Sequence, residues 1–235
     1  MSDPVVGKIV WDKTGERFYE TGTSNGVLYP KNASGAYGTG VPWNGLTAVN
    51  ENPSGAEETK LFADNIKYLS LYSAEEFGCT IEAFTYPKEF EACDGSIEIA
   101  PGVMAGQQNR RGFGFSYRTI LGNDEQGEAY GYKLHIVYGA TASPSQKSYG
   151  TVNDSPNAVT LSWDVTTTPV AINADLKPTA LLVIDSTKID SEKLAAIEDI
   201  LYGTDPTTAE EGGTATPGTA PRLPMPSEII ELLEG

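Results

Sequence analysis

The sequence predicts a mainly β domain over residues 1–205, followed by a linker over residues 206–226 and a short C-terminal helix over residues 227–235. Apolar and aromatic residues alternate with polar ones in several segments, which is the pattern of half-buried strands. Gly, Asn and Pro separate these segments and mark turns. A length of 235 residues suits one large domain with a single core.

Residues 5–49 are predicted to form short extended pieces separated by turns. Val5 to Trp11 is strand-like, and Asn25-Gly26 is a dipeptide typical of a hairpin turn. Pro42 lacks an amide proton, so it places its segment at a sheet edge or at the start of a strand. Residues 50–60 have almost nothing to bury and are predicted to form a long polar loop. Such loops are usually functional or disordered.

Further strands are expected over residues 66–72, 79–86, 113–121, 130–138, 159–165 and 180–184. Alternation places two sets of side chains on inward faces, Cys79, Ile81 and Ala83 in one strand and Phe113, Phe115 and Tyr117 in another. Residues 122–127 form a turn between two strands. Residues 87–93 are predicted to form a short helix, with Pro87 near its first turn.

One segment departs clearly from the β pattern. Asp190 is a good N-cap, apolar residues follow at helical spacing, and Gly203 stands where a C′ glycine belongs. Beyond it, a stretch rich in Thr, Gly, Pro and Ala predicts a mobile tether that ends at Pro226. The apolar cluster of residues 229–233 predicts a helix that folds only against a surface. That surface is its own domain, a neighbouring subunit or another protein.

The charge balance is strongly acidic. Sixteen Lys and Arg stand against 32 Asp and Glu, so the formal net charge is −16. Such a chain repels nucleic acid and anionic membranes on average. Neither a secretory signal nor a transmembrane segment is recognisable, which favours a cytosolic protein. Cys79 and Cys93 are then expected to be reduced structural residues, although the sequence alone leaves a disulfide open.

The sequence offers no motif for catalysis. His135 is the single histidine, and its place in an alternating strand favours a hydrogen-bonded structural role. No set of histidines and cysteines has the spacing of a metal site. The acidic pairs are expected to be solvated surface: Glu57-Glu58, Glu75-Glu76 and Glu210-Glu211. The sequence therefore predicts that the protein is not an enzyme, with no catalytic, cofactor-binding or metal-binding residues and no cofactor.

One basic segment has two interpretations. Arg110-Arg111 and Arg118 alternate with aromatic residues, an arrangement that can stack on single-stranded nucleic acid. The alternative is favoured: the aromatic side chains point into the core and the arginines pair with acidic side chains of the same or a neighbouring subunit.

Several ordered, irregular segments carry a resemblance that covers most of residues 1–205. They are residues 43–47, 63–68, 75–87, 107–110, 112–115 and 132–134, with Trp163 and the helix at 190–202. Together they resemble the major tail proteins of siphophages, the bacteriophages with long, non-contractile tails. The resemblance implies a β-sandwich or open barrel with a flanking α-helix, the tail tube fold.

The resemblance also implies a function and a set of partners. Subunits of that family form hexameric rings that stack into a tube, and DNA passes through the lumen without specific binding. The expected partners are other copies of the chain, the tape-measure protein, the tail terminator and the distal tail proteins. The expected location is the virion tail, assembled in the host cytoplasm and without a membrane. In that family a long loop between early strands commonly bridges stacked rings.

Two alternatives remain from the sequence. One is the inner tube of a contractile tail or of a secretion machine. The other, from a different class, is a carbohydrate-binding or hydrolytic β-sandwich of a phage or cell surface. Glycan binding by the monomer distinguishes the latter from a self-assembling subunit.

Overall fold

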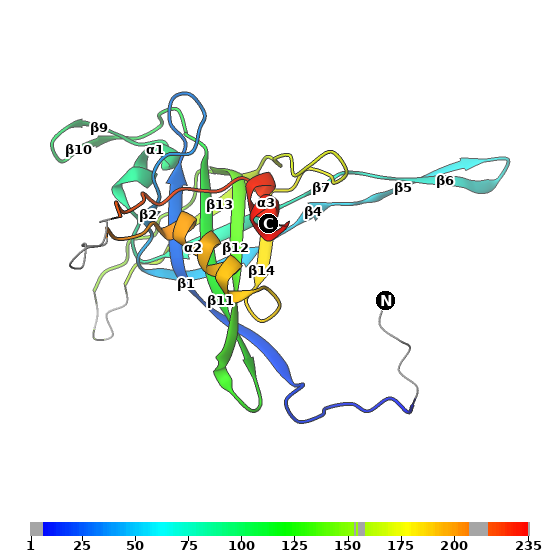
Figure 1. Cartoon of the computed structure of the whole chain (residues 1–235). Helices are drawn as coiled ribbons and strands as arrows, with labels where there is room; N and C mark the ends of the chain where they lie inside the picture. Colours follow the sequence, from blue (N-terminus) through cyan, green and yellow to red (C-terminus); the bar gives the residue numbers. More distant parts are fainter. Residues whose placement is uncertain (1–6, 153, 155–157, 207–215, 235) are drawn as a thin grey trace, which may run out of the picture.

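A computed structural model describes residues 7–152, 154, 158–206 and 216–234 of the chain (Figure 1). The protein is mainly β, with one large antiparallel sheet and a few helices, as the sequence predicts. The sheet contains β1 (Phe18–Pro30), β2 (Val41–Pro42), β3 (Leu46–Glu51), β8 (Gly78–Ala83), β11 (Phe113–Asn123), β12 (Gly127–Ala142), β13 (Leu161–Thr167) and β14 (Leu181–Asp185).

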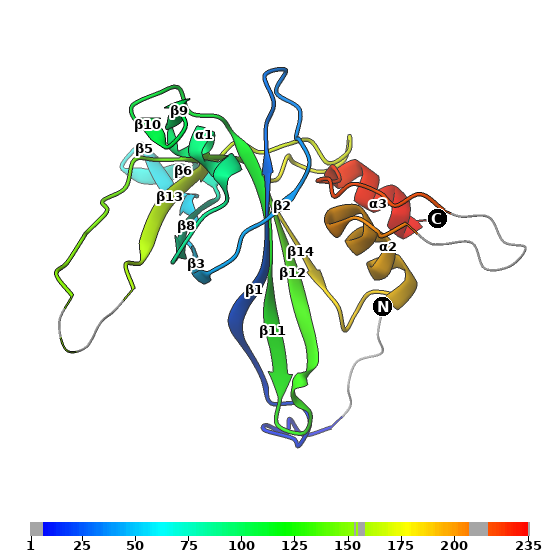
Figure 2. The ribbon, with the colours of Figure 1, turned by 90° about the vertical axis from the view of Figure 1, so that its left-hand side faces the viewer.

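The strands of this sheet follow the order β2-β1-β11-β12-β13-β8-β3, and β14 pairs with β12 beside that path. The sheet folds over, so that its two halves face each other. Figure 2 shows β1, β11 and β12 as a central layer, with β13, β8 and β3 on one side of it. The helices α2 (Ser191–Tyr202) and α3 (Pro226–Glu234) lie on the other side.

The inner core fills the space between the two halves of the sheet. Its centre is a group of aromatic side chains in tilted or edge-to-face contact, where the ring of Phe90 lies 4.5 Å from Trp43 and 5.1 Å from Trp163. The two inward sets predicted from alternation both belong to this core: Cys79, Ile81, Ala83, Phe113, Phe115 and Tyr117. Those predictions are confirmed because each strand keeps its period of two.

The outer core lies between the sheet and the two helices. Residues of β12 that alternate with the inner set, such as Leu134 and Ile136, pack here against Ile197 and Leu201 of α2. The helix begins as predicted, because the Asp190 carboxylate accepts hydrogen bonds from the backbone amides of Glu192 and Lys193. The short helix after Pro87 is also confirmed, as the turn η1 (Lys88–Phe90) and α1 (Glu91–Asp94).

Two predictions for the N-terminal part are wrong. Asn25-Gly26 does not turn the chain, since both residues lie inside the continuous strand β1. The positive φ of 51° at Asn25 instead belongs to an irregular region, where the register of β1 against β11 shifts twice between Thr21 and Val27. Residues 7–11 are not a strand either, because no other strand pairs with them in the described chain, and Val5 and Val6 lie outside the described residues.

The C-terminal segment differs from the mobile tether expected for it. Residues 207–215 lie outside the described residues, but residues 216–226 are attached to the domain. The amide of Gly40 donates to the Pro221 carbonyl at 2.9 Å, and Tyr138 Oη donates to the Pro224 carbonyl at 2.9 Å. Leu223 and Ile229 are buried in the outer core. The predicted C-terminal helix is present as α3, and the surface it folds against is its own domain.

Candidate functional site

Residues 50–60 do not form the predicted loop. Asn50 and Glu51 end β3, and the residues after them belong to a long two-stranded arm that leaves the sheet after β3 and returns to it at β8 (Figure 1). Its base pairs β4 (Ser54–Gly55) with β7 (Glu75–Glu76), and its outer part pairs β5 (Glu58–Ala63) with β6 (Ile66–Tyr72). The strand predicted over residues 66–72 is therefore present, but its partner is the segment just before it. The chain reverses at Asp64 and Asn65, both with positive φ.

The register gives the arm two different faces. Thr59 lies opposite Leu71, and Leu61 lies opposite Leu69, so these four side chains share one face. A bulge at Tyr68 shifts the register, after which Ala63 lies opposite Ile66. Because alternation along β5 continues through this point, Ala63 and Ile66 extend the same apolar face. We call the set Leu61, Ile66, Leu69 and Leu71 the arm's apolar face.

The opposite face of the arm combines charged and aromatic side chains, since Tyr72 lies opposite Glu58 and Phe62 lies opposite Lys67. The Glu58 carboxylate contacts the ammonium groups of Lys60 and Lys67 and the hydroxyl of Ser70. These contacts lower the pKa of Glu58, with the hydrogen bond from Lys67 as the largest cause. The charged groups of this face are thus paired within the arm itself, whereas Phe62 and Tyr72 stay exposed.

The arm's apolar face, by contrast, is uncovered. Its four members are 37–64% exposed. Further exposed aromatic surface comes from Tyr68 at the bulge and from Phe62 and Tyr72 on the opposite face. A second exposed apolar hairpin pairs β9 (Ile97–Ala100) with β10 (Val103–Ala105) on the other side of the molecule (Figure 1). Contiguous exposed apolar surface on a soluble domain usually marks a contact with another molecule. An isolated two-stranded ribbon is also only marginally stable alone. The arm is therefore the strongest candidate for a functional surface.

His135 has a structural environment, in agreement with the sequence. Its ring stacks on Tyr117 with the ring centroids 4.6 Å apart. Nε2 lies 3.0 Å from Thr119 Oγ1, and Nδ1 lies 3.1 Å from Glu51 Oε1. Glu51 also accepts a hydrogen bond from Tyr117 Oη at 2.7 Å, and it ends the strand from which the arm departs. The cluster thus ties the arm's base to the opposite half of the sheet.

This cluster predicts a loss of stability in mild acid. Burial lowers the pKa of His135 below 6.5, against the opposing effect of Glu51 and Glu20. The unfolded chain therefore takes up this proton at a higher pH than the folded one does. The stabilisation is complete above the unfolded pKa of 6.5 and declines as the pH falls from there through the folded pKa.

Thermal unfolding at about pH 7.5 and about pH 5.5 measures this loss, and His135→Gln is expected to reduce the difference in Tm between them. Glu20 does not contribute to this difference in Tm, because its pKa lies below the pH range compared. Burial raises its pKa, but hydrogen bonds from Lys133 and Thr119 outweigh that effect and bring it below 4.5. An unchanged pH difference in the variant would show that His135 is not the group that titrates.

The remaining predicted residues also have structural environments. Arg110 lies 3.6 Å from Asp94, and Arg118 lies 2.7 Å from Glu198 between the rings of Tyr132 and Tyr202. This confirms the pairing interpretation for both arginines.

Both cysteines are free and buried, as expected, and burial raises the pKa of each to about 12. The acidic pairs at 57–58 and 75–76 are exposed on the arm, and the pair at 210–211 lies outside the described residues.

Within the described residues, no three His, Cys, Asp or Glu side chains gather as metal ligands. The helices described there are all too short or too polar to cross a membrane. No protein-family model matches the chain. No curated protein matches it either.

Proposed function

We propose that this protein is the major tail tube subunit of a siphophage, a structural virion protein that assembles into stacked hexameric rings. The observation that carries the proposal is the arm: a ribbon with an uncovered apolar face, and with its charged groups paired on the opposite face, projecting far from the body of the domain. An arm of this kind needs a second molecule to cover it. The resemblance implies that a long loop between early strands bridges stacked rings, and the arm connects the early strands β3 and β8.

The folded-over sheet also suits a ring. In the described part of the chain, β3 pairs with β8 alone and β1 pairs along most of its length with β11 alone, so both strands have free edges. Free edges invite pairing with another chain, and closure into a ring removes that hazard. We propose that this sheet is the tail tube form of the β-sandwich or open barrel, with α2 as the flanking helix.

The charge of the chain is consistent with this role. A net charge of −16 disfavours binding to DNA, so DNA can move through a lumen without being held. The proposed partners are further copies of the chain, the tape-measure protein, and the terminator and distal proteins of the tail. The proposed place of assembly is the host cytoplasm.

Negative-stain electron microscopy of the purified chain tests the proposal. At rising protein concentration we expect hollow tubes of uniform width, and sedimentation is expected to show monomers converting into large assemblies without a stable small oligomer. A heterologous contact that repeats along an axis produces this behaviour. A chain that stays monomeric or dimeric at every concentration, with tail-tip proteins added as nuclei, would remove the proposal.

A further inference from the structure

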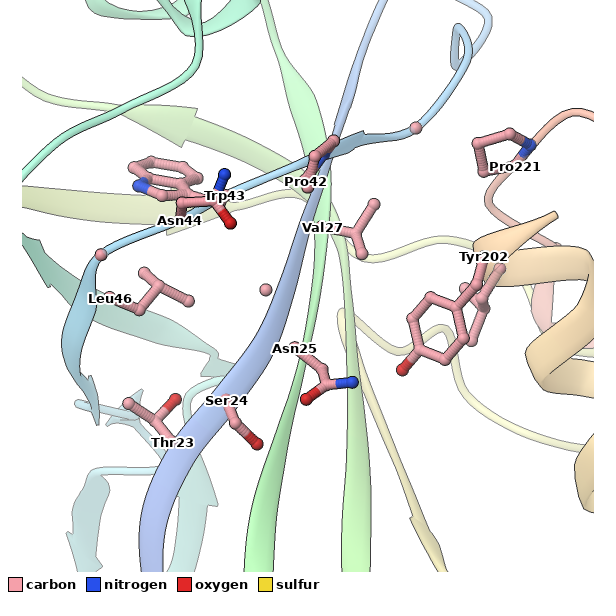
Figure 3. Close-up of a pocket in the computed structure, with 14 residues that line it drawn as sticks. Thr23, Ser24, Asn25, Val27, Pro42, Trp43, Asn44, Leu46, Tyr202 and Pro221 are labelled. Atoms are coloured by element: carbon pink, nitrogen blue, oxygen red, sulfur yellow. The ribbon is translucent and has the colours of Figure 1, made fainter.

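The open edge of β1 borders a cavity of about 500 Å3 (Figure 3). Val27 and Leu28 pair with the short strand β2, and the carbonyls of Gly26 and Pro30 accept hydrogen bonds from the amides of Trp43 and Gly38. No other strand in the described part of the chain pairs with this edge of β1. Below β2, Thr23, Ser24 and Asn25 of β1 line the cavity. Below Gly26 this edge of β1 therefore has no paired strand in the described chain, and the cavity lies beside it.

The walls of the cavity suit a strand with apolar side chains. Figure 3 shows Trp43, Asn44 and Leu46 on one side of β1 and Tyr202 and Pro221 on the other. Side chains that alternate along an added strand would enter these two sides in turn. In addition, Thr23 Oγ1 is buried without a hydrogen-bond partner in the described structure. A backbone carbonyl of an added strand is a suitable acceptor for it.

The chain contains a segment with the matching properties. Residues 8–11 are Lys-Ile-Val-Trp, a composition that favours strands, yet they form no strand in the structure. Ile9, Val10 and Trp11 are 68%, 61% and 72% exposed. Figure 1 shows this segment running away from the body of its own domain, not back along β1. A strand-forming sequence without a partner, and a strand edge without a partner, thus occur in one chain.

We propose that residues 8–11 of one copy add a strand to the open edge of β1 in a second copy. The backbone of the segment pairs with β1 below β2. Ile9 and Trp11 point to one side of the cavity and Val10 to the other. This inference rests on the proposed self-assembly, which it deepens by naming a second intersubunit contact, separate from the arm. Backbone pairing of this kind binds by hydrogen bonds and selects by side-chain pockets.

A cysteine cross-link tests the contact. The full-length chain carries Val10→Cys together with Asn44→Cys, an exposed residue at the cavity. The native cysteines are buried and do not compete. After mild oxidation at assembly concentration, we expect a ladder of disulfide-linked dimers and larger species on a non-reducing gel. The matched control pairs Val10→Cys with Asn109→Cys. Asn109 is exposed, as Asn44 is, but does not line the cavity, so the control pair is expected to give no ladder.

Electron microscopy of the same samples separates this inference from the proposed function. Tubes without any cross-link overturn the added strand and leave the tube proposal standing. A ladder without tubes supports the added strand and counts against the tube. A disulfide formed only within single chains, visible as a faster-moving monomer, overturns the second copy as the partner because the segment then occupies its own edge. A ladder of equal strength from the control pair also overturns the proposal.

Discussion

Replacing Leu61 and Leu71 by serine is expected to abolish tubes at concentrations where the unmodified chain assembles. Both residues belong to the arm's apolar face and are 42% and 54% exposed. Burying the exposed part of two leucines contributes about 2 kcal/mol to each intersubunit contact. Because about 1.4 kcal/mol corresponds to a tenfold change in an equilibrium constant, the concentration needed for assembly should rise roughly thirtyfold. Light scattering against protein concentration measures this threshold.

The effect should be confined to assembly. Neither leucine packs into the inner or the outer core, so the Tm of the monomer is expected to stay unchanged. Lys60→Gln, on the opposite face of the same strand, is the matched control. It removes one exposed ion pair, an interaction typically worth less than about 1 kcal/mol, and should leave the threshold near its original value. Normal assembly of the double serine variant would show that the apolar face makes no contact between subunits.

Truncation after Tyr202 is expected to destabilise the monomer strongly. It removes Leu223 and Ile229, which are buried at 5% and 3% exposure in the outer core, and it uncovers the side chains beneath them. Full burial of two such side chains contributes about 3–6 kcal/mol. For a domain of this size, that loss lowers Tm by an amount on the order of 10 °C. Differential scanning calorimetry of both chains measures the difference.

A pair of point variants keeps this result interpretable if the truncated chain does not fold. Ile229→Ala removes a buried side chain of α3 and should cost about 2–5 kcal/mol. Glu231→Ala, on the exposed side of the same helix, should change Tm little. Equal Tm values for all of these chains would restore the mobile tether that the composition of the segment suggests.

The sequence predicted correctly those elements whose residue pattern depends only on residues nearby in the chain. The alternation of Cys79, Ile81 and Ala83 and the cap at Asp190 are local, and both are confirmed. The failures depend on partners far along the chain. Residues 216–226 look like a linker by composition, but contacts with Gly40 and Tyr138 fix their path. The composition of a segment does not predict such long-range contacts.

The arm was missed for a related reason. Residues 50–60 are all exposed, so they show no buried face from which a strand could be recognised. In the structure, Thr59 and Leu61 pair with the strand predicted at 66–72, and a two-residue turn separates the two strands. The candidate site therefore required the register, because only the register shows that Leu61, Leu69 and Leu71 fall on one face.

The arm pairs residues that are close in the sequence, whereas the sheet pairs residues that are far apart in it. In the arm, Ala63 pairs with Ile66, and in the sheet, Phe18 pairs with Asn123. Local hairpins form in about 1–10 μs, whereas domains dominated by distant strand pairs need milliseconds to seconds. The marginally stable ribbon therefore forms and reopens while the sheet is still unfolded, and during synthesis it emerges from the ribosome before β11 does. During that interval each nascent chain exposes the apolar side chains of the arm before its domain has folded. A slower translation of residues 73–123 should therefore increase losses to aggregation in the cell.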